Sequence, residues 1–188
     1  SLFVIGVIKT RFERRTGHLH RKLTLIRYFC VMFSTFKKFA SSNKLFSNKD
    51  NILVTVSGGT DSVVLCHLFS EAKINFAIAH CNFKLRGEES DGDEIFVKQL
   101  AKKLNVPFFV NHFDTNTYAA EKNISIQMAA RELRYEWFEE IRKKNKYNFI
   151  ATAHHKGDVA ETMLINLTRG TGIHGLHGIS VKQNKIIR

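Results

Sequence analysis

The chain has 188 residues, of which 44% are apolar and only one is proline, and its formal net charge is +12. This length suits one α/β domain, and the composition excludes a disordered or low-complexity protein. No run approaches the about 18 consecutive apolar residues of a membrane-spanning helix, so no membrane partner is expected. Cys30, Cys66 and Cys81 form no CxxC pair and give an odd count, which favours a reducing cytoplasm over a disulfide framework.

Half of the excess positive charge lies in residues 1–31, which contain seven Lys or Arg and one acid. The segment has no clean helical or strand period, and its apolar pieces are too short for a secretory signal. An organellar transit peptide would be richer in Ser, and Met32 opens a stretch typical of a protein start. We therefore expect 1–31 to be a non-native or disordered extension rather than a functional basic arm, and 32–188 to form the domain.

From Asn51 onward, short β-rich runs alternate with longer helical stretches. Strands are predicted at 52–56, 75–81, 107–112 and 148–153, because each is a short apolar run beside turn residues. The predicted helices are 60–71, 88–104, 125–144 and 157–167. This alternation predicts parallel strands joined by right-handed crossovers, and hence a doubly wound α/β sheet with helices on both faces.

The loop at 57–62 joins the first predicted strand to the first helix, where doubly wound folds bind their ligands. Its two glycines let the backbone approach phosphate oxygens, and the N–H groups of the helix start face an anion. Phosphates would repel Asp61 unless Mg²⁺ lay between them, so Asp61 implies a metal. The GxxxxGK[ST] and GxGxxG patterns are both missing, which argues against a Walker-type NTPase and a dinucleotide site. The predicted nucleotide contacts here are Ser57, Gly58, Gly59, Thr60, Asp61 and Ser62.

The alternative interpretation of this loop is an ordinary strand-to-helix turn in which Thr60 is the N-cap.

The loop resembles the SGGxDS signature of the PP-loop ATP pyrophosphatases, which bind ATP and release pyrophosphate while they adenylate a substrate. Further stretches resemble the tRNA(Ile)-lysidine synthetases: AHCNFKLRG from residue 79, QMAARELRY from residue 127, TAHHKGDVAET from residue 152 and TRGTG from residue 168. The resemblance runs from about residue 36 to the end of the chain. Lys156 and Gly157 depart from the bulkier pair of many relatives but leave the acids that follow in register.

The resemblance implies ATP and Mg²⁺ as cofactors, and tRNA(Ile) with a CAU anticodon and L-lysine as partners. In the implied reaction the O2 atom of the wobble cytidine attacks the α-phosphate of ATP, and the amine of lysine then displaces AMP at C2. It also implies C-terminal tRNA-binding domains, so the chain is expected to be a fragment that holds the catalytic domain. The oligomeric state stays open, a homodimer being one alternative.

Asp158 and Glu161 lie three residues apart on one face of the predicted fourth helix. Their carboxylates can hold Mg²⁺ or the ammonium of a lysine, so we predict Asp61, Asp158 and Glu161 as catalytic residues and Asp61 and Asp158 as metal ligands. The alternative is that Asp158 only caps the helix. The resemblance further implies nucleotide contacts by His80, Arg131, His155, Arg169 and Gly170.

Other interpretations of these side chains stay open. His80 can equally pair with backbone at a strand end, and Arg131 and Arg134 can be solvated surface charges. Lys84 and Arg86 are interpreted as solvated loop charges or RNA contacts. A PP-loop tRNA thiolase is the rival enzyme, although such enzymes typically carry catalytic cysteines, often as CxxC. A nucleotide-binding sensor is the rival from another class, and it would not need three acids at the phosphates.

Overall fold

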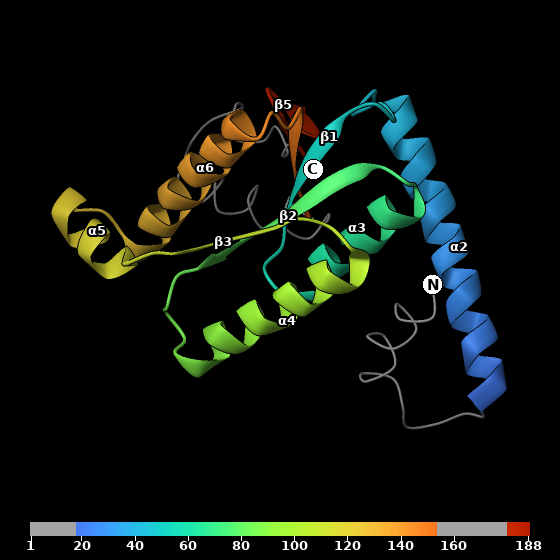
Figure 1. The fold of residues 1–188 in the computed structure, drawn as a ribbon, viewed down its shortest axis with the longest axis horizontal. Coiled ribbons are helices and arrows are strands. Elements are labelled where there is room, and N and C mark those ends of the chain that lie inside the picture. Colours follow the sequence, from blue (N-terminus) through green and yellow to red (C-terminus); the bar gives the residue numbers. More distant parts are fainter. Residues whose placement is uncertain (1–17, 154–179) are drawn as a thin grey trace, which may run out of the picture.

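The computed structural model describes residues 18–153 and 180–188, with side chains from residue 27 onward. Helices lie on both sides of a twisted six-stranded sheet (Figure 1). The elements are α2 (His18–Ser42), β1 (Asn51–Thr55), α3 (Thr60–Glu71), β2 (Asn75–Asn82), α4 (Glu88–Leu104), β3 (Phe108–His112), α5 (Thr115–Lys122), α6 (Ile126–Lys144), β4 (Phe149–Thr152), β5 (Lys182–Gln183) and β6 (Ile186–Ile187).

The strands follow the order β3-β2-β1-β4-β6-β5, and all neighbours are parallel except β5 and β6. The chain moves outward from β1 through β2 to β3, and then returns to place β4 on the other side of β1. The point where the order reverses is a crevice at the carboxyl ends of β1 and β4, the usual ligand site of such sheets. The predicted doubly wound parallel sheet is confirmed.

The side chains of β1 alternate between two hydrophobic cores. Ile52 and Val54 pack in the core that includes residues of α3 and α4, whereas Leu53 packs with Phe138 and Ile141 of α6. Ile52, Leu53 and Val54 are all fully buried, as expected for a strand covered on both faces. The helices therefore cover both faces of the sheet, as predicted.

The main helices begin and end close to their predicted limits. α3 and α4 match the predicted 60–71 and 88–104, and α6 begins after Ser125, whose hydroxyl caps it by accepting from the Met128 N–H at 3.2 Å. α4 opens with Glu88, Glu89 and Asp91 and closes with lysines, the polarity that stabilises a helix dipole. The predicted helix at 157–167 lies outside the described residues.

Two features are not predicted from the sequence. α5 begins at a cap made by Asp114, which accepts from the Thr117 N–H at 3.1 Å and from its hydroxyl at 2.7 Å. The β5–β6 hairpin adds to the sheet beside β4 and is tied to the end of α2, because Lys182 Nζ donates to the carbonyls of Lys44 and Leu45 at 3.0 Å each. The short strands depend on these long-range contacts, and so their own composition gives little signal.

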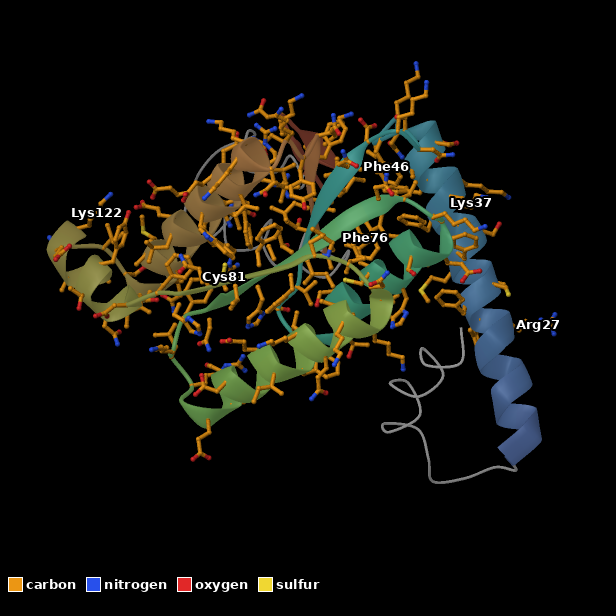
Figure 2. All side chains as sticks on the ribbon, in the orientation of Figure 1. Arg27, Lys37, Phe46, Phe76, Cys81 and Lys122 are labelled. Carbon is orange, nitrogen blue, oxygen red and sulfur yellow. The ribbon has the colours of Figure 1, made fainter. Side chains whose placement is uncertain are left out.

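α2 passes through residues 31 and 32 without a break, so residues 18–31 are helical although their sequence shows no clear period. Among the described side chains of this helix, Phe36 packs on Phe46 and Phe69 with ring centroids 6.1 and 5.5 Å apart. Tyr28 and Val31 are 70% and 61% exposed. Figure 2 shows Arg27 pointing away from the molecule, and Phe46 lying where α2 meets the core. The domain boundary at residue 32 stays a prediction.

None of the described helices combines the length and the apolar character that crossing a bilayer requires.

Deletion of residues 1–31 tests this boundary. We expect the melting temperature to change by less than about 2 °C, because the described part of the segment buries little apolar surface. The control is Phe36→Ala, which removes a ring from the core and should lower the melting temperature by about 4 °C or more. Thermal denaturation followed by circular dichroism measures both, and a larger drop in the deletion than in the control would show that 1–31 packs on the domain.

Candidate functional site

A cleft with a volume of about 280 Å³ lies at the carboxyl ends of β1, β2 and β4. Its walls come from the loop after β1, the loop after β2, the first turns of α4 and the middle of α6. The cleft thus lies at the reversal point of the strand order. The lining side chains used below are Ser57, Ser62, His80, Cys81, Asn82, Phe83, Arg86, Asp93, Arg134 and Tyr135.

The 57–62 loop turns from β1 into the start of α3. Gly59 is the N-cap, with φ −70° and ψ 157°, and within the described residues no side chain caps the helix. Ser62 Oγ donates to the Gly59 carbonyl at 2.8 Å, and the Gly59 N–H donates to Ser57 Oγ at 3.4 Å. The alternative with Thr60 as N-cap is therefore wrong. An uncapped helix start beside two serine hydroxyls is suited to a phosphate group.

Gly58 is the position of this loop that requires glycine. Its φ is +94°, and a Cβ added to it would lie 2.8 Å from Oδ1 of Asp93 in α4. A Cβ on Gly59 would meet nothing closer than Ser57 Oγ at 3.5 Å, which is ordinary contact. The loop after β1 is thus packed closely against an acid from α4.

His80 lies at the end of β2, is 3% exposed and lines the cleft. Its Nδ1 lies 2.7 Å from the Val56 carbonyl, which can only accept, so Nδ1 carries the hydrogen. The pairing with backbone is therefore present, and the ring also lines the cleft, while a contact of His80 with the nucleotide stays a prediction. In the neutral ring Nε2 is the acceptor.

Asn82 ends β2 and connects the cleft to α4. Its amide nitrogen donates to Asp91 and Glu94 at 3.0 Å each, and its oxygen accepts from the Lys84 N–H at 3.0 Å. Burial of Glu94 acts to raise the pKa of its carboxyl, but hydrogen bonds from Asn82 and His112 outweigh this and hold the pKa below its usual value. Asn82 therefore fixes the loop after β2, and its two amide hydrogens are used within the protein.

Arg131 and Arg134 lie differently on α6. Arg134 lines the cleft with its guanidinium 5.1 Å from the centre of the Phe83 ring. Arg131, the predicted contact, is exposed and lies 5.1 Å from the ring of Tyr135, outside the lining residues. Its predicted role stays a prediction. Their spacing of three residues did not indicate which of the two lines the cleft.

Arg86 and Asp93 also belong to the cleft, and neither was expected to take part. Arg86 donates to Asp93 at 3.0 Å and to Glu89 at 2.9 Å. The available signal was the position of Arg86 after the second strand, because the carboxyl ends of parallel strands share one edge of the sheet.

The two cysteines of the described core, Cys66 and Cys81, are thiols whose pKa is raised by burial. Burial raises the pKa of Cys81 to about 12, although the Arg134 charge opposes this, and burial raises the pKa of Cys66 to about 12 as well. Both are protonated at neutral pH and are therefore poor nucleophiles.

The second half of the predicted site lies outside the described residues: His155, Asp158, Glu161, Arg169 and Gly170. Among residues 18–153 and 180–188, no three His, Cys, Asp or Glu side chains come together to hold a metal. A Mg²⁺ ion that bridges phosphates takes only one or two protein carboxylates. Asp61 at the start of α3 is exposed and lies outside the lining residues of the cleft, and its metal role stays a prediction.

A family model described as a PP-loop domain matches residues 32–188. The chain belongs to the PP-loop domain family, as its SGGTDS loop predicts, and ATP is the nucleotide that this domain uses.

Within that family the chain is similar to tRNA(Ile)-lysidine synthases. It is 50% identical to that of Bacteroides thetaiotaomicron over 151 residues, which cover 80% of this chain and 35% of the relative. It is 53% identical to that of Porphyromonas gingivalis over 142 residues, which cover 75% of this chain and 31% of the relative. The chain thus spans about a third of the length of these curated relatives. The predicted resemblance is confirmed.

Solved structures share the fold. The U34-tRNA thiolase NcsA from Methanococcus maripaludis has a TM-score of 0.56 at 20% identity, covering 74% of this chain and 51% of the thiolase. The NH3-dependent NAD synthetase from Campylobacter jejuni has a TM-score of 0.54 at 14% identity, covering 84% and 69%. These likenesses support the architecture alone.

Gly58→Ala tests the close packing of the loop. We expect a loss of about 1–3 kcal/mol in unfolding free energy, because alanine at this φ is strained and its Cβ displaces Asp93. ATP affinity should fall about tenfold or more, that is by at least about 1.4 kcal/mol. The matched control is Gly59→Ala, which has a common φ and room for a Cβ. Equal denaturation midpoints and ATP dissociation constants for the two variants would contradict the role given to Gly58.

Proposed function

We propose that the protein containing this chain attaches lysine to the wobble cytidine of a tRNA(Ile) with a CAU anticodon, at the expense of ATP. The observation that carries the proposal is the 57–62 loop, an uncapped helix start with two serine hydroxyls at the carboxyl end of β1. The similarity to lysidine synthases over most of the chain supports the choice of substrates.

In the first step the O2 atom of cytidine attacks the α-phosphorus of ATP. The bond from that phosphorus to the bridging oxygen breaks, and its electron pair leaves with pyrophosphate. The N–H groups of the loop and the Ser57 and Ser62 hydroxyls stabilise the charge that develops there. When bound, Mg²⁺ supplies further positive charge, and Asp61 is the residue that would hold it.

In the second step the lysine amine attacks C2 of the adenylated base. The C2–O2 bond breaks, O2 leaves as part of AMP, and the amine loses a proton. Asp158 and Glu161 are assigned to the lysine ammonium or to the metal, a role that rests on their spacing and on the family resemblance. His80 is assigned to the adenosine, because its Nε2 can accept a hydrogen bond.

Two alternatives are less favoured. A thiolase that works through a thiolate is disfavoured by the raised pKa of Cys81, the thiol that lines the cleft. A sensor that only binds ATP would not need the three acids Asp61, Asp158 and Glu161 together at the phosphates. The three free cysteines fit the proposed cytoplasmic location.

Asp61→Ala tests the metal role. With Mg²⁺ present, we expect ATP to bind about ten- to a hundredfold more weakly, the value of a charge-assisted contact. Without Mg²⁺ the variant should bind ATP as tightly as the parent or more tightly, because the carboxylate then only repels phosphate. Isothermal titration with and without EDTA measures both, and an unchanged affinity in Mg²⁺ would refute the assignment.

Asp158→Asn and Glu161→Gln test the lysine step in the complete gene product. Both changes are nearly isosteric, so the fold should persist, while transfer of labelled lysine should fall about tenfold or more for each lost charge. Glu140→Gln, at an exposed position near the end of α6, is the matched control and should transfer lysine normally.

The outcomes separate the alternatives. Normal transfer in both variants would leave the two acids as helix caps. Incorporation of sulfur instead of lysine by the parent would favour the thiolase, and ATP binding without pyrophosphate release would favour the sensor.

A further inference from the structure

The phosphate-binding loop brings no positive side chain of its own. Residues 57–62 contain two glycines, two serines, a threonine and an aspartate, and Asp61 adds negative charge where pyrophosphate would carry several. Walker-type loops solve the same problem with a lysine inside the loop, which this chain lacks. Apart from the proposed Mg²⁺, any positive charge at the loop must therefore come from a side chain of another element.

Arg86 and Arg134 are the arginines among the residues that line the described cleft. Arg134 approaches from α6, and its guanidinium lies against the Phe83 ring. Arg86 approaches from the loop after β2, and its contacts lead to the phosphate loop itself. Its Nη2 lies 3.0 Å from Oδ2 of Asp93, and Oδ1 of the same carboxylate packs against Gly58. One carboxylate thus separates the Arg86 guanidinium from the loop.

The backbone at Arg86 is held in place, whereas its side chain is free to change partners. The Arg86 N–H donates to Ser90 Oγ at 3.2 Å, which ties the loop to the first turn of α4. The Arg86 side chain is 58% exposed, and its partners Glu89 and Asp93 are 67% and 30% exposed. Exposed ion pairs add little to stability, so exchanging one of them for a phosphate costs little. A guanidinium binds phosphate oxygens through two parallel hydrogen bonds, which favours the exchange.

We propose that Arg86 is a phosphate-binding residue that contacts the pyrophosphate portion of ATP, and that Asp93 is the positioning residue that holds its guanidinium at the loop before ATP arrives. This inference rests on the function proposed above. It gives the loop after β2 a direct part in stabilising the leaving group.

The test measures binding of three probes to the complete gene product by isothermal titration in Mg²⁺: ATP, pyrophosphate and AMP. Arg86→Ala should weaken pyrophosphate and ATP about tenfold or more, as for a charged hydrogen bond, and should leave AMP within about twofold. Arg86→Lys should recover part of the loss, because it keeps the charge without the two-pronged geometry. The matched control is Glu89→Gln, which removes the other ion-pair partner of Arg86 and should leave all three affinities unchanged.

The Asp93→Asn background separates binding from positioning. If Arg86 contacts phosphate, adding Arg86→Ala to Asp93→Asn still weakens pyrophosphate about tenfold or more. If Arg86 acts only by holding Asp93 against Gly58, the second change has no further effect, and the inference is overturned. Equal losses for AMP and pyrophosphate in Arg86→Ala would overturn it as well, since they would indicate a general distortion of the cleft.

The parent protein distinguishes this inference from the proposed function. A parent that binds neither ATP nor pyrophosphate would contradict the proposed function. If the parent binds both and Arg86→Ala binds them with the same affinities, only the role of Arg86 is contradicted.

Discussion

The position of β1 between β2 and β4 is the constraint on which the site depends. The two neighbours are reached by crossovers on opposite faces, so the loop leaving β1 has no crossing chain above it and opens into a crevice. This arrangement determines from which side each described element of the site approaches the crevice. The loop after β2 and the first turns of α4 approach from one side, and α6 approaches from the other.

Much of the fold could be predicted from the sequence because its strands and helices have strong local signals. The acids and lysines at the two ends of α4 and the Ser125 cap of α6 mark helix limits within a few residues of the chain. α2 was missed because residues 18–31 show no clear apolar period in the sequence. The β5–β6 hairpin was missed because its strands are two residues long and rely on Lys182. Local patterns do not report contacts between residues more than a hundred positions apart.

The site also has residues that could be predicted from the sequence and residues that could not. The place of the 57–62 loop beside the cleft could be predicted because its six residues are consecutive and follow a strand, and that of His80 because it lies near the end of β2 at the same edge. The position of Arg86 after the second strand was a usable signal. Asp93 and Arg134 could not be singled out, since each looks like an ordinary surface charge until the tertiary fold brings it to the cleft. The choice between Arg131 and Arg134 depends on the rotation of α6 about its axis, which the sheet and Phe138 decide.

The alternation of β1 between two cores has a consequence for binding. β1 is paired along both edges, with Leu53 opposite Ala77 of β2 and Ile150 of β4. A shift of the strand by one residue would exchange Ile52, Leu53 and Val54 between two closely packed cores, so a slipped pairing would lose the fit of these side chains on both faces of the sheet. The position of Ser57 along the strand direction, relative to β2 and β4, is therefore fixed before any nucleotide binds. A ligand that meets groups already in place loses less affinity to their ordering, so the buried apolar residues of β1 contribute to nucleotide affinity without touching the nucleotide.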